Sequence, residues 1–287
     1  MVVEPLDATL GAVVTGVSLA GLTDDQWATI ADAFVEHALL VFPAQHLDDD
    51  QQRAFGERFG ELDVLVRDRG GTVAITNQRA DGSVVPDDHQ ALAVMRGNEG
   101  WHTDSSYMPI AAKASVLSAR VVPPTGGETE WADMRAAYEA LDDETRDRIA
   151  DLAAYHSLVY SQARAGAEQR GGYGIDQPEM PLRPLVKVHP ETGRSALFIG
   201  RHAHDIPGLD PSESEAMLDR LLDEACRPPR LYRHHWQVGD VVAWDNRSVL
   251  HRAHPFDYRE PRVMVHTRIA GDLVSEAGIG SRPTVTA

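Results

Sequence analysis

The second half of the chain contains short apolar segments separated by turns that are rich in glycine, proline and charged residues. Residues 184–188 and 196–199 flank one polar turn, and residues 231–236 and 241–244 flank another. Two strand-length runs joined by such a turn are typical of a β-hairpin. Many short strands and few helices predict an α+β protein with a mainly β core, arranged as a jelly roll with flanking helices. The two sheets of a jelly roll can enclose a ligand cavity.

The rest of the chain adds helices and further strands to this core. Helical spacing of apolar residues predicts helices at 23–37, 48–59, 134–152 and 212–225. Strand-like runs lie at 39–42, 72–75, 114–122 and 129–132. No repeat or linker divides the sequence, so we expect a single domain over residues 1–287. Less regular segments predict lids at 64–100 and 162–177, and a frayed tail is expected at 275–287.

A candidate metal site begins in the sequence Trp-His-Thr-Asp-Ser-Ser-Tyr at 101–107. In an extended strand alternate side chains share a face, so His102 and Asp104 project together. A 2-His-1-carboxylate site for Fe(II) needs one more neutral imidazole, and His251 can supply it from far downstream. His254 is a competing ligand. Because the chain holds 13 histidines, the triplet alone is also compatible with surface polar residues or with buried ones that already have partners.

A strand at 262–269 is expected to carry charge toward the interior. Its residues alternate, so that Arg262, Met264, His266 and Arg268 share one face and the intervening apolar residues and Thr267 share the other. Cations on the inner face of a strand are costly unless an anion meets them. The alternation therefore indicates a site for an anionic ligand.

Four motifs in this order resemble the taurine dioxygenase and 2,4-dichlorophenoxyacetate dioxygenase (TauD/TfdA) family of Fe(II)/2-oxoglutarate oxygenases. They are Trp-His-Thr-Asp at 101–104, Gly-Gly-Glu-Thr-Glu-Trp at 126–131, Trp-Asp-Asn at 244–246 leading to His251, and Arg262. The resemblance extends from about Pro5 to Asp272. It implies a double-stranded β-helix with helices outside.

The same resemblance implies the roles of individual residues. His102, Asp104 and His251 match the iron ligands that carry catalysis, and Thr129 and Arg262 match contacts to 2-oxoglutarate. The implied reaction uses O2, converts 2-oxoglutarate to succinate and CO2, and hydroxylates an aliphatic C–H bond. Related halogenases have a small residue where Asp104 stands, so Asp104 predicts oxygenation.

The substrate is predicted to be a small organic anion. The taurine enzyme has a second arginine four positions after the one that matches Arg262, and this chain has His266 there. His266 and Arg268 are the two candidates for binding the substrate anion, with Arg268 able to supply the charge, and Asn98 and the backbone at Ser105 complete the pocket. We therefore expect a carboxylate substrate of aryloxyalkanoate type ahead of taurine. The alternatives are a sulfonate or sulfate-ester dioxygenase of the same family, a zinc hydrolase, or a non-enzymatic metal-dependent jelly-roll binding protein.

The composition of the chain limits the possible binding partners and locations. The formal net charge is −17, with 44 acidic residues against 27 lysines and arginines, which argues against a nucleic-acid or anionic-membrane partner. Cys226 is the only cysteine, so the chain can form no intramolecular disulfide, and a reducing cytoplasm is the expected location. No apolar run reaches the ~18 residues that span a bilayer. We also expect a homo-oligomer, either a dimer or a tetramer.

Overall fold

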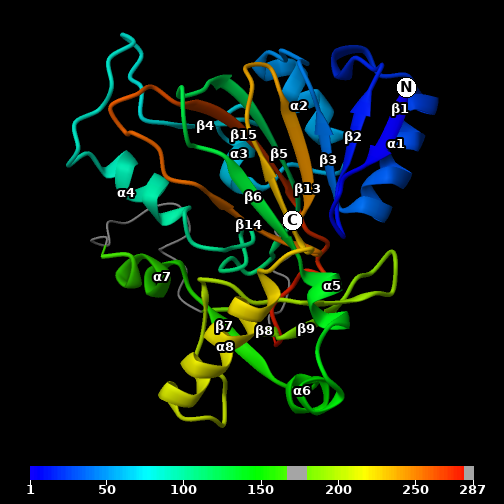
Figure 1. Ribbon diagram of the computed structural model, residues 1–287, viewed down its shortest axis with the longest axis vertical. Coiled ribbons are helices and arrows are strands. Elements are labelled where there is room, and N and C mark those ends of the chain that lie inside the picture. The colour runs from blue at the N-terminus through cyan, green and yellow to red at the C-terminus, as the bar shows by residue number, and fades with distance from the viewer. Residues whose placement is uncertain (167–179, 281–287) are drawn as a thin grey trace.

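A computed structural model describes residues 1–166 and 180–280 of the chain (Figure 1). Its largest element is a seven-stranded sheet in which neighbouring strands are antiparallel, except for one parallel pair, β2 and β3. In spatial order the strands are β1 (Val2–Pro5), β2 (Ala12–Thr15), β3 (Leu39–Phe42), β13 (Val241–Asp245), β5 (Ala112–Val121), β15 (Val263–Ala270) and β4 (Val73–Thr76). Distant parts of the sequence therefore meet in this sheet.

Three smaller sheets complete the β structure that is described. The first pairs β12 (Leu231–His234), β6 (Thr129–Asp133) and β14 (Val249–Ala253). The second pairs β11 (Ala203–His204), β7 (Ala153–His156) and β8 (Leu182–Pro184). The third is the predicted hairpin of β9 (Val186–Val188) and β10 (Ser195–Leu197). The protein is thus mixed in class and mainly sheet.

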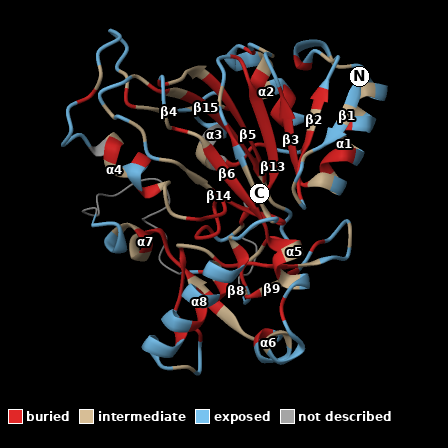
Figure 2. Cartoon of the chain, viewed as in Figure 1, coloured by how far each residue is buried: buried red, intermediate tan, exposed pale blue. Residues whose placement is uncertain are grey.

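Helices lie around the sheets, and several of them bury one side (Figure 2). They are η1 (Leu19–Gly21), α1 (Asp24–His37), α2 (Asp49–Glu57), α3 (Val64–Arg67), α4 (Gln90–Gly97), α5 (Met134–Glu139), α6 (Asp143–Ile149), α7 (Leu158–Arg164) and α8 (Pro211–Ala225). Thr23 and Asp48 begin α1 and α2 with complete capping boxes, as expected for these residue types. Among the described residues, no helix is both long and apolar enough to cross a membrane.

Helix α2 covers the face of β15 that turns away from the candidate site. Gly56 approaches so closely that a Cβ atom there would lie 2.6 Å from Cγ2 of Thr267. Buried Gln52 donates to the carbonyl oxygen of Val265 at 2.7 Å. Because α2 takes the Val265 and Thr267 side of the strand, residues 264, 266 and 268 point to the other side, as the alternation predicts.

Four sequence expectations need correction. The runs at 231–236 and 241–244 do not form a hairpin, because β12 pairs with β6 whereas β13 pairs with β3 and β5. The helix expected at 134–152 is two helices, because Asp142 accepts a hydrogen bond from the Thr145 amide and caps a new start at α6. Residues 64–100 are more regular than expected, since they contain α3, β4 and α4. The tail is not frayed from Ser275, because Glu276 is buried and ion-paired with Lys187; residues 281–287 lie outside the described part.

Candidate active site

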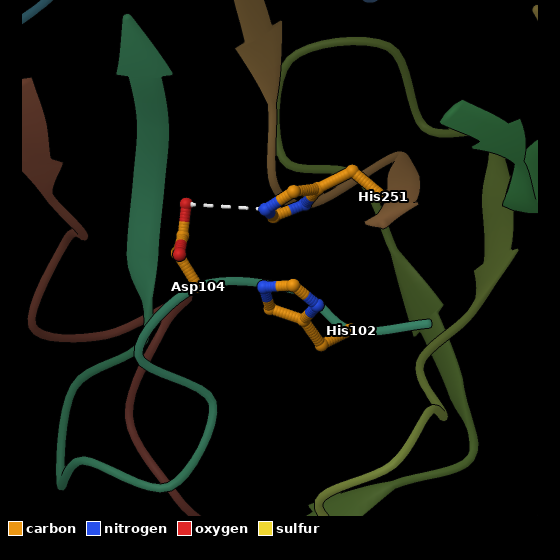
Figure 3. Close-up of side chains that lie close together, drawn as sticks. All are labelled: His102, Asp104 and His251. Carbon is orange, nitrogen blue, oxygen red and sulfur yellow. Dashed lines mark ion pairs between the residues drawn. The ribbon is translucent and has the colours of Figure 1, made fainter. Parts of the chain in front are cut away.

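Two backbone hydrogen bonds connect the two candidate metal-binding histidines. The amide of His102 donates to the carbonyl oxygen of His251 at 2.9 Å, and the amide of His251 donates to that of His102 at 2.8 Å. This antiparallel bridge joins the segment before β5 to β14 and places the two imidazole centroids 4.2 Å apart. The Asp104 carboxylate enters the same space, and the ligand atoms of the three residues lie within 4.8 Å of one another (Figure 3).

The extended conformation expected at residues 102–104 ends with Asp104. Alternation holds as far as Asp104, because the Thr103 hydroxyl points the other way and donates to the carbonyl oxygen of Asn246 at 2.8 Å. The chain then turns, with Ser105 in the left-handed region at φ 55°. The turn leaves Asp104 at the end of the extended stretch, where its carboxylate faces both histidines.

A buried hydrogen-bond network fixes the orientation of Asp104. The Ser115 hydroxyl on β5 donates to Oδ2 of Asp104 at 2.7 Å and accepts from Nδ2 of Asn246 at 3.0 Å. Oδ1 of Asn246 in turn accepts from the indole Nε1 of Trp244 at 2.9 Å and from the Asp104 amide at 3.3 Å. The metal-facing carboxylate is therefore held by strands β5 and β13 as well as by its own loop.

The protonation states of the three side chains suit a metal ion. Burial, together with His251 and Arg201, lowers the pKa of His102 well below its ordinary value, and burial lowers the pKa of His251 to about 4. Burial alone would raise the pKa of Asp104, but Arg268, His251 and His266 hold it well below its usual range. Two neutral imidazoles and one ionised carboxylate are the forms that bind a divalent metal.

The tautomer of His102 is also determined. Its Nδ1 lies 2.8 Å from the carbonyl oxygen of Gly100, and a carbonyl oxygen can only accept, so Nδ1 carries the proton. Nε2 then keeps its lone pair for a metal ion. His254 does not join the cluster, because its Nε2 lies 3.1 Å from Oε2 of Glu130. Among the described residues, only His102, Asp104 and His251 form a group suited to a metal ion.

Arg262 lies just before β15 as a buried cation that pairs with no described carboxylate. One of its terminal nitrogens donates to the carbonyl oxygen of Gly127 at 2.9 Å, while its buried Nε has no hydrogen-bond partner. Burial lowers its pKa to about 10. Gly127 has a φ of 74°, and a Cβ atom there would lie 3.1 Å from Nε of Arg262. The Gly-Gly motif thus makes room for this guanidinium.

The other predicted cosubstrate contact, Thr129, begins strand β6 and is buried. Its hydroxyl oxygen accepts from Nε1 of Trp236 at 2.9 Å.

The predicted substrate residues lie in two places: His266, Arg268 and Ser105 lie near Asp104, and Asn98 lies at the end of α4. Nε2 of His266 lies 3.5 Å and a terminal nitrogen of Arg268 lies 3.8 Å from the Asp104 carboxylate, and Arg268 also donates to the Ser105 hydroxyl at 3.0 Å. Asn98 caps the end of α4, and its carbonyl oxygen accepts from the Ala253 amide at 2.8 Å. Their roles in substrate binding remain predictions.

Sequence reasoning missed several residues that contact these side chains. Ser115 holds Asp104, Asn246 holds Ser115, and Oδ1 of Asn77 accepts from the Arg262 amide at 2.8 Å. Arg201 was also missed, although its charge contributes to the lowered pKa values of both candidate histidine ligands. For Ser115, the available signal was the presence of serines in the largely apolar run at 114–122.

These features define a class. Two neutral imidazoles and an ionised carboxylate on a mainly β scaffold match the donor set of mononuclear non-haem iron oxygenases. A sequence profile of the "Taurine catabolism dioxygenase TauD, TfdA family" matches residues 3–268. The chain belongs to this family, and it is an α-ketoglutarate-dependent dioxygenase, that is, an oxidoreductase.

Individual relatives support this membership. The chain is 53% identical over 285 residues to a protein of Sphingobium herbicidovorans named (S)-phenoxypropionate/alpha-ketoglutarate-dioxygenase, covering 96% of this chain and 97% of the relative. It is 36% identical to an alpha-ketoglutarate-dependent 2,4-dichlorophenoxyacetate dioxygenase of Cupriavidus pinatubonensis, covering 96% and 99%. The crystal structure of AAD-2 in complex with Mn(II) and N-oxalylglycine superposes with a TM-score of 0.88 at 38% identity, covering 94% and 98%.

Proposed function

We propose that this enzyme uses Fe(II), O2 and 2-oxoglutarate to hydroxylate the carbon next to the ether oxygen of an aryloxyalkanoate. The proposal rests on two features that occur together. One is the cluster of His102, Asp104 and His251, and the other is Arg262, a buried cation that forms no ion pair with a described carboxylate. The relatives named for phenoxypropionate and dichlorophenoxyacetate support the choice of substrate. Bound Fe(II) supplies the activation of O2, with 2-oxoglutarate as the reductant.

The residues of the chain bind and orient the reactants. His102, Asp104 and His251 hold the metal, and the hydrogen bond from Ser115 keeps Asp104 facing it. Arg262 binds the distal carboxylate of 2-oxoglutarate through a charge-assisted hydrogen bond, supported by Thr129. The net reaction consumes one O2 and one 2-oxoglutarate and gives succinate, CO2 and a hydroxylated product. Hydroxylation beside the ether oxygen yields a hemiketal or hemiacetal, which breaks into a phenol and a 2-oxo acid.

The proposal includes an architecture for the site. The seven-stranded sheet and the β12-β6-β14 sheet are the two sheets of a jelly roll, or double-stranded β-helix, within a single domain. In support, Trp131 of β6 packs against Trp244 of β13 with ring centroids 5.6 Å apart. Residues 64–100 form one lid; most of the second proposed lid, from residue 167 onward, lies outside the described residues. We further propose a cytoplasmic homo-oligomer without nucleic-acid or membrane partners, in keeping with the acidic charge.

A turnover screen tests this function. Purified enzyme with Fe(II) and 2-oxoglutarate is assayed for succinate and phenol release with (R)- and (S)-2-phenoxypropionate, phenoxyacetate, taurine and an alkyl sulfate. We expect the highest rate with an aryloxyalkanoate and equal amounts of phenol and succinate. Taurine or the alkyl sulfate as the best substrate would replace the proposed substrate by the sulfonate or sulfate-ester alternative. Absence of succinate with every compound would contradict the oxygenase function itself.

A further inference from the structure

Arg201 lies beside the candidate metal cluster. It pairs with one edge of the extended Trp101–His102 segment, and His251 pairs with the opposite edge. The amide of Arg201 donates to the carbonyl oxygen of Trp101 at 2.8 Å, whereas the amide and carbonyl of His102 pair with His251. Successive carbonyls of an extended segment point to opposite edges, so the Trp101–His102 backbone lies between His251 and Arg201. Gly200 permits this approach, because a Cβ atom there would lie 3.0 Å from the Trp101 carbonyl oxygen.

The side chain of Arg201 runs along the backbone that orients His102. A Cβ atom at Gly97 would lie 3.0 Å from a terminal nitrogen of Arg201, and one at Gly100 would lie 3.1 Å from its Cδ. Gly100 is the residue whose carbonyl oxygen accepts from Nδ1 of His102. The guanidinium is therefore packed against the end of α4 and next to a candidate metal ligand.

No described carboxylate compensates this charge. Nε of Arg201 is buried without a hydrogen-bond partner, and no described Asp or Glu forms an ion pair with it. The C-terminal end of α4 offers a partial negative charge, which typically contributes only ~0.3–1 kcal/mol. Arg268 differs, because it lies 3.8 Å from Asp104 and donates to Ser105. Arg201 and Arg262 are thus two cations near the site that can accept a carboxylate from outside the chain.

An apolar cluster lies near Arg201, because its member Tyr107 acts on the charge of Arg201. Buried Tyr107, Met108 and Leu158 form a small cluster, against which partly buried Leu65 packs. The rings of Tyr107 and His202 are 5.0 Å apart, and the His202 ring is 6.0 Å from that of His102. The Tyr107 and His202 rings therefore connect this apolar cluster to the candidate metal ligand His102.

We propose that Arg201 binds the carboxylate of the organic substrate, while Arg262 binds the distal carboxylate of 2-oxoglutarate. Each of the two anionic reactants then has its own arginine, and Arg268 remains engaged with Asp104. Recognition of the carboxylate deepens the proposed function and rests on it. It makes Arg201 a specificity-determining residue, because a neutral substrate would leave the guanidinium without an anion.

The test compares a carboxylate with its neutral counterpart. Calorimetry with Mn(II) and N-oxalylglycine bound measures affinity for 2-phenoxypropionate and for its primary amide without turnover. For Arg201→Gln we expect the carboxylate to bind about 10- to 100-fold more weakly, which is typical for loss of a charge-assisted hydrogen bond. The amide and N-oxalylglycine should bind as in the unchanged enzyme. Arg201→Lys should recover part of the lost affinity.

Arg148→Gln is the matched control, since it removes an arginine charge from an exposed ion pair with Glu213. The role of Arg201 would be overturned if Arg201→Gln lowered the affinities for the carboxylate and the amide equally, or if it left the affinity for the carboxylate unchanged. The same comparison on succinate-producing sulfonates or alkyl sulfates separates the two hypotheses. If Arg201→Gln weakens binding of these sulfonates or sulfates, Arg201 is still an anion site, but the aryloxyalkanoate substrate is rejected. If the affinities for these anions do not depend on Arg201, the anion site at Arg201 is rejected and the oxygenase function stands.

Discussion

Replacing Ser115 by Ala should weaken metal binding by 10- to 100-fold without unfolding the protein. The Ser115 hydroxyl donates to Oδ2 of Asp104 at 2.7 Å and accepts from Asn246 at 3.0 Å, and the residue is fully buried. Losing the bond to a charged acceptor costs ~1.5–3 kcal/mol, and Asn246 is left with an unsatisfied N–H. We expect the free energy of unfolding to fall by ~2–4 kcal/mol. The loss of metal affinity follows because residues that orient metal ligands typically contribute this factor.

The same strand provides the control. Ser118 is also buried, and its hydroxyl donates to Oε1 of Gln52, away from the metal cluster. Ser118→Ala removes the same atom and should lower stability by ~1–2 kcal/mol while leaving Mn(II) affinity unchanged. Urea denaturation of the metal-free proteins measures the first quantity, and calorimetric titration with Mn(II) measures the second. Wild-type Mn(II) affinity in Ser115→Ala, or equal losses in both variants, would refute the argument that this hydroxyl orients Asp104.

Three further results are expected. His251→Ala should abolish Mn(II) binding and succinate production, whereas His254→Ala should retain both; the reverse outcome in calorimetry would exchange their roles. Arg262→Gln should weaken the binding of 2-oxoglutarate by ~2–5 kcal/mol, which lowers the affinity on the order of a hundredfold or more, while metal binding persists. An unchanged affinity for 2-oxoglutarate would show that Arg262 does not bind the cosubstrate. Burial would raise the pKa of Asp245, but its bonds to Arg247 lower it, so its stabilising contribution is present above pH ~4 and is lost as pH falls through the lower folded value. Asp245→Asn should therefore lower the free energy of unfolding at pH 7 by ~3–5 kcal/mol and weaken its dependence on acid pH; urea denaturation showing an unchanged pH profile would contradict this.

Local patterns in the sequence predicted the elements well where one physical signal dominated. Capping residues marked the starts of α1 and α2, and strict alternation placed His266 and Arg268 on the same face of β15. The single helix expected at 134–152 was wrong because apolar spacing continues across a new cap at Asp142. Periodicity describes a face, whereas a cap decides where a helix begins.

The residues around the ligands were harder to predict because they depend on strand register. Ser115 reaches Asp104 only because the chain folds back after the turn at Ser105, and Asn246 reaches both because β13 pairs with β5. Arg201 comes from a segment that no local motif connects to residues 101–104. Contacts of this kind are set by long-range pairing, on which spacing along the chain gives no information.

The bridge between His102 and His251 has a consequence for the order of folding events. The two residues come from distant parts of the chain, so their mutual hydrogen bonds form only after a long loop has closed. No short segment contains all three candidate ligands, so a partly folded chain offers a metal ion no complete binding site. We therefore expect metal to act mainly by slowing the unfolding rate, with little acceleration of folding.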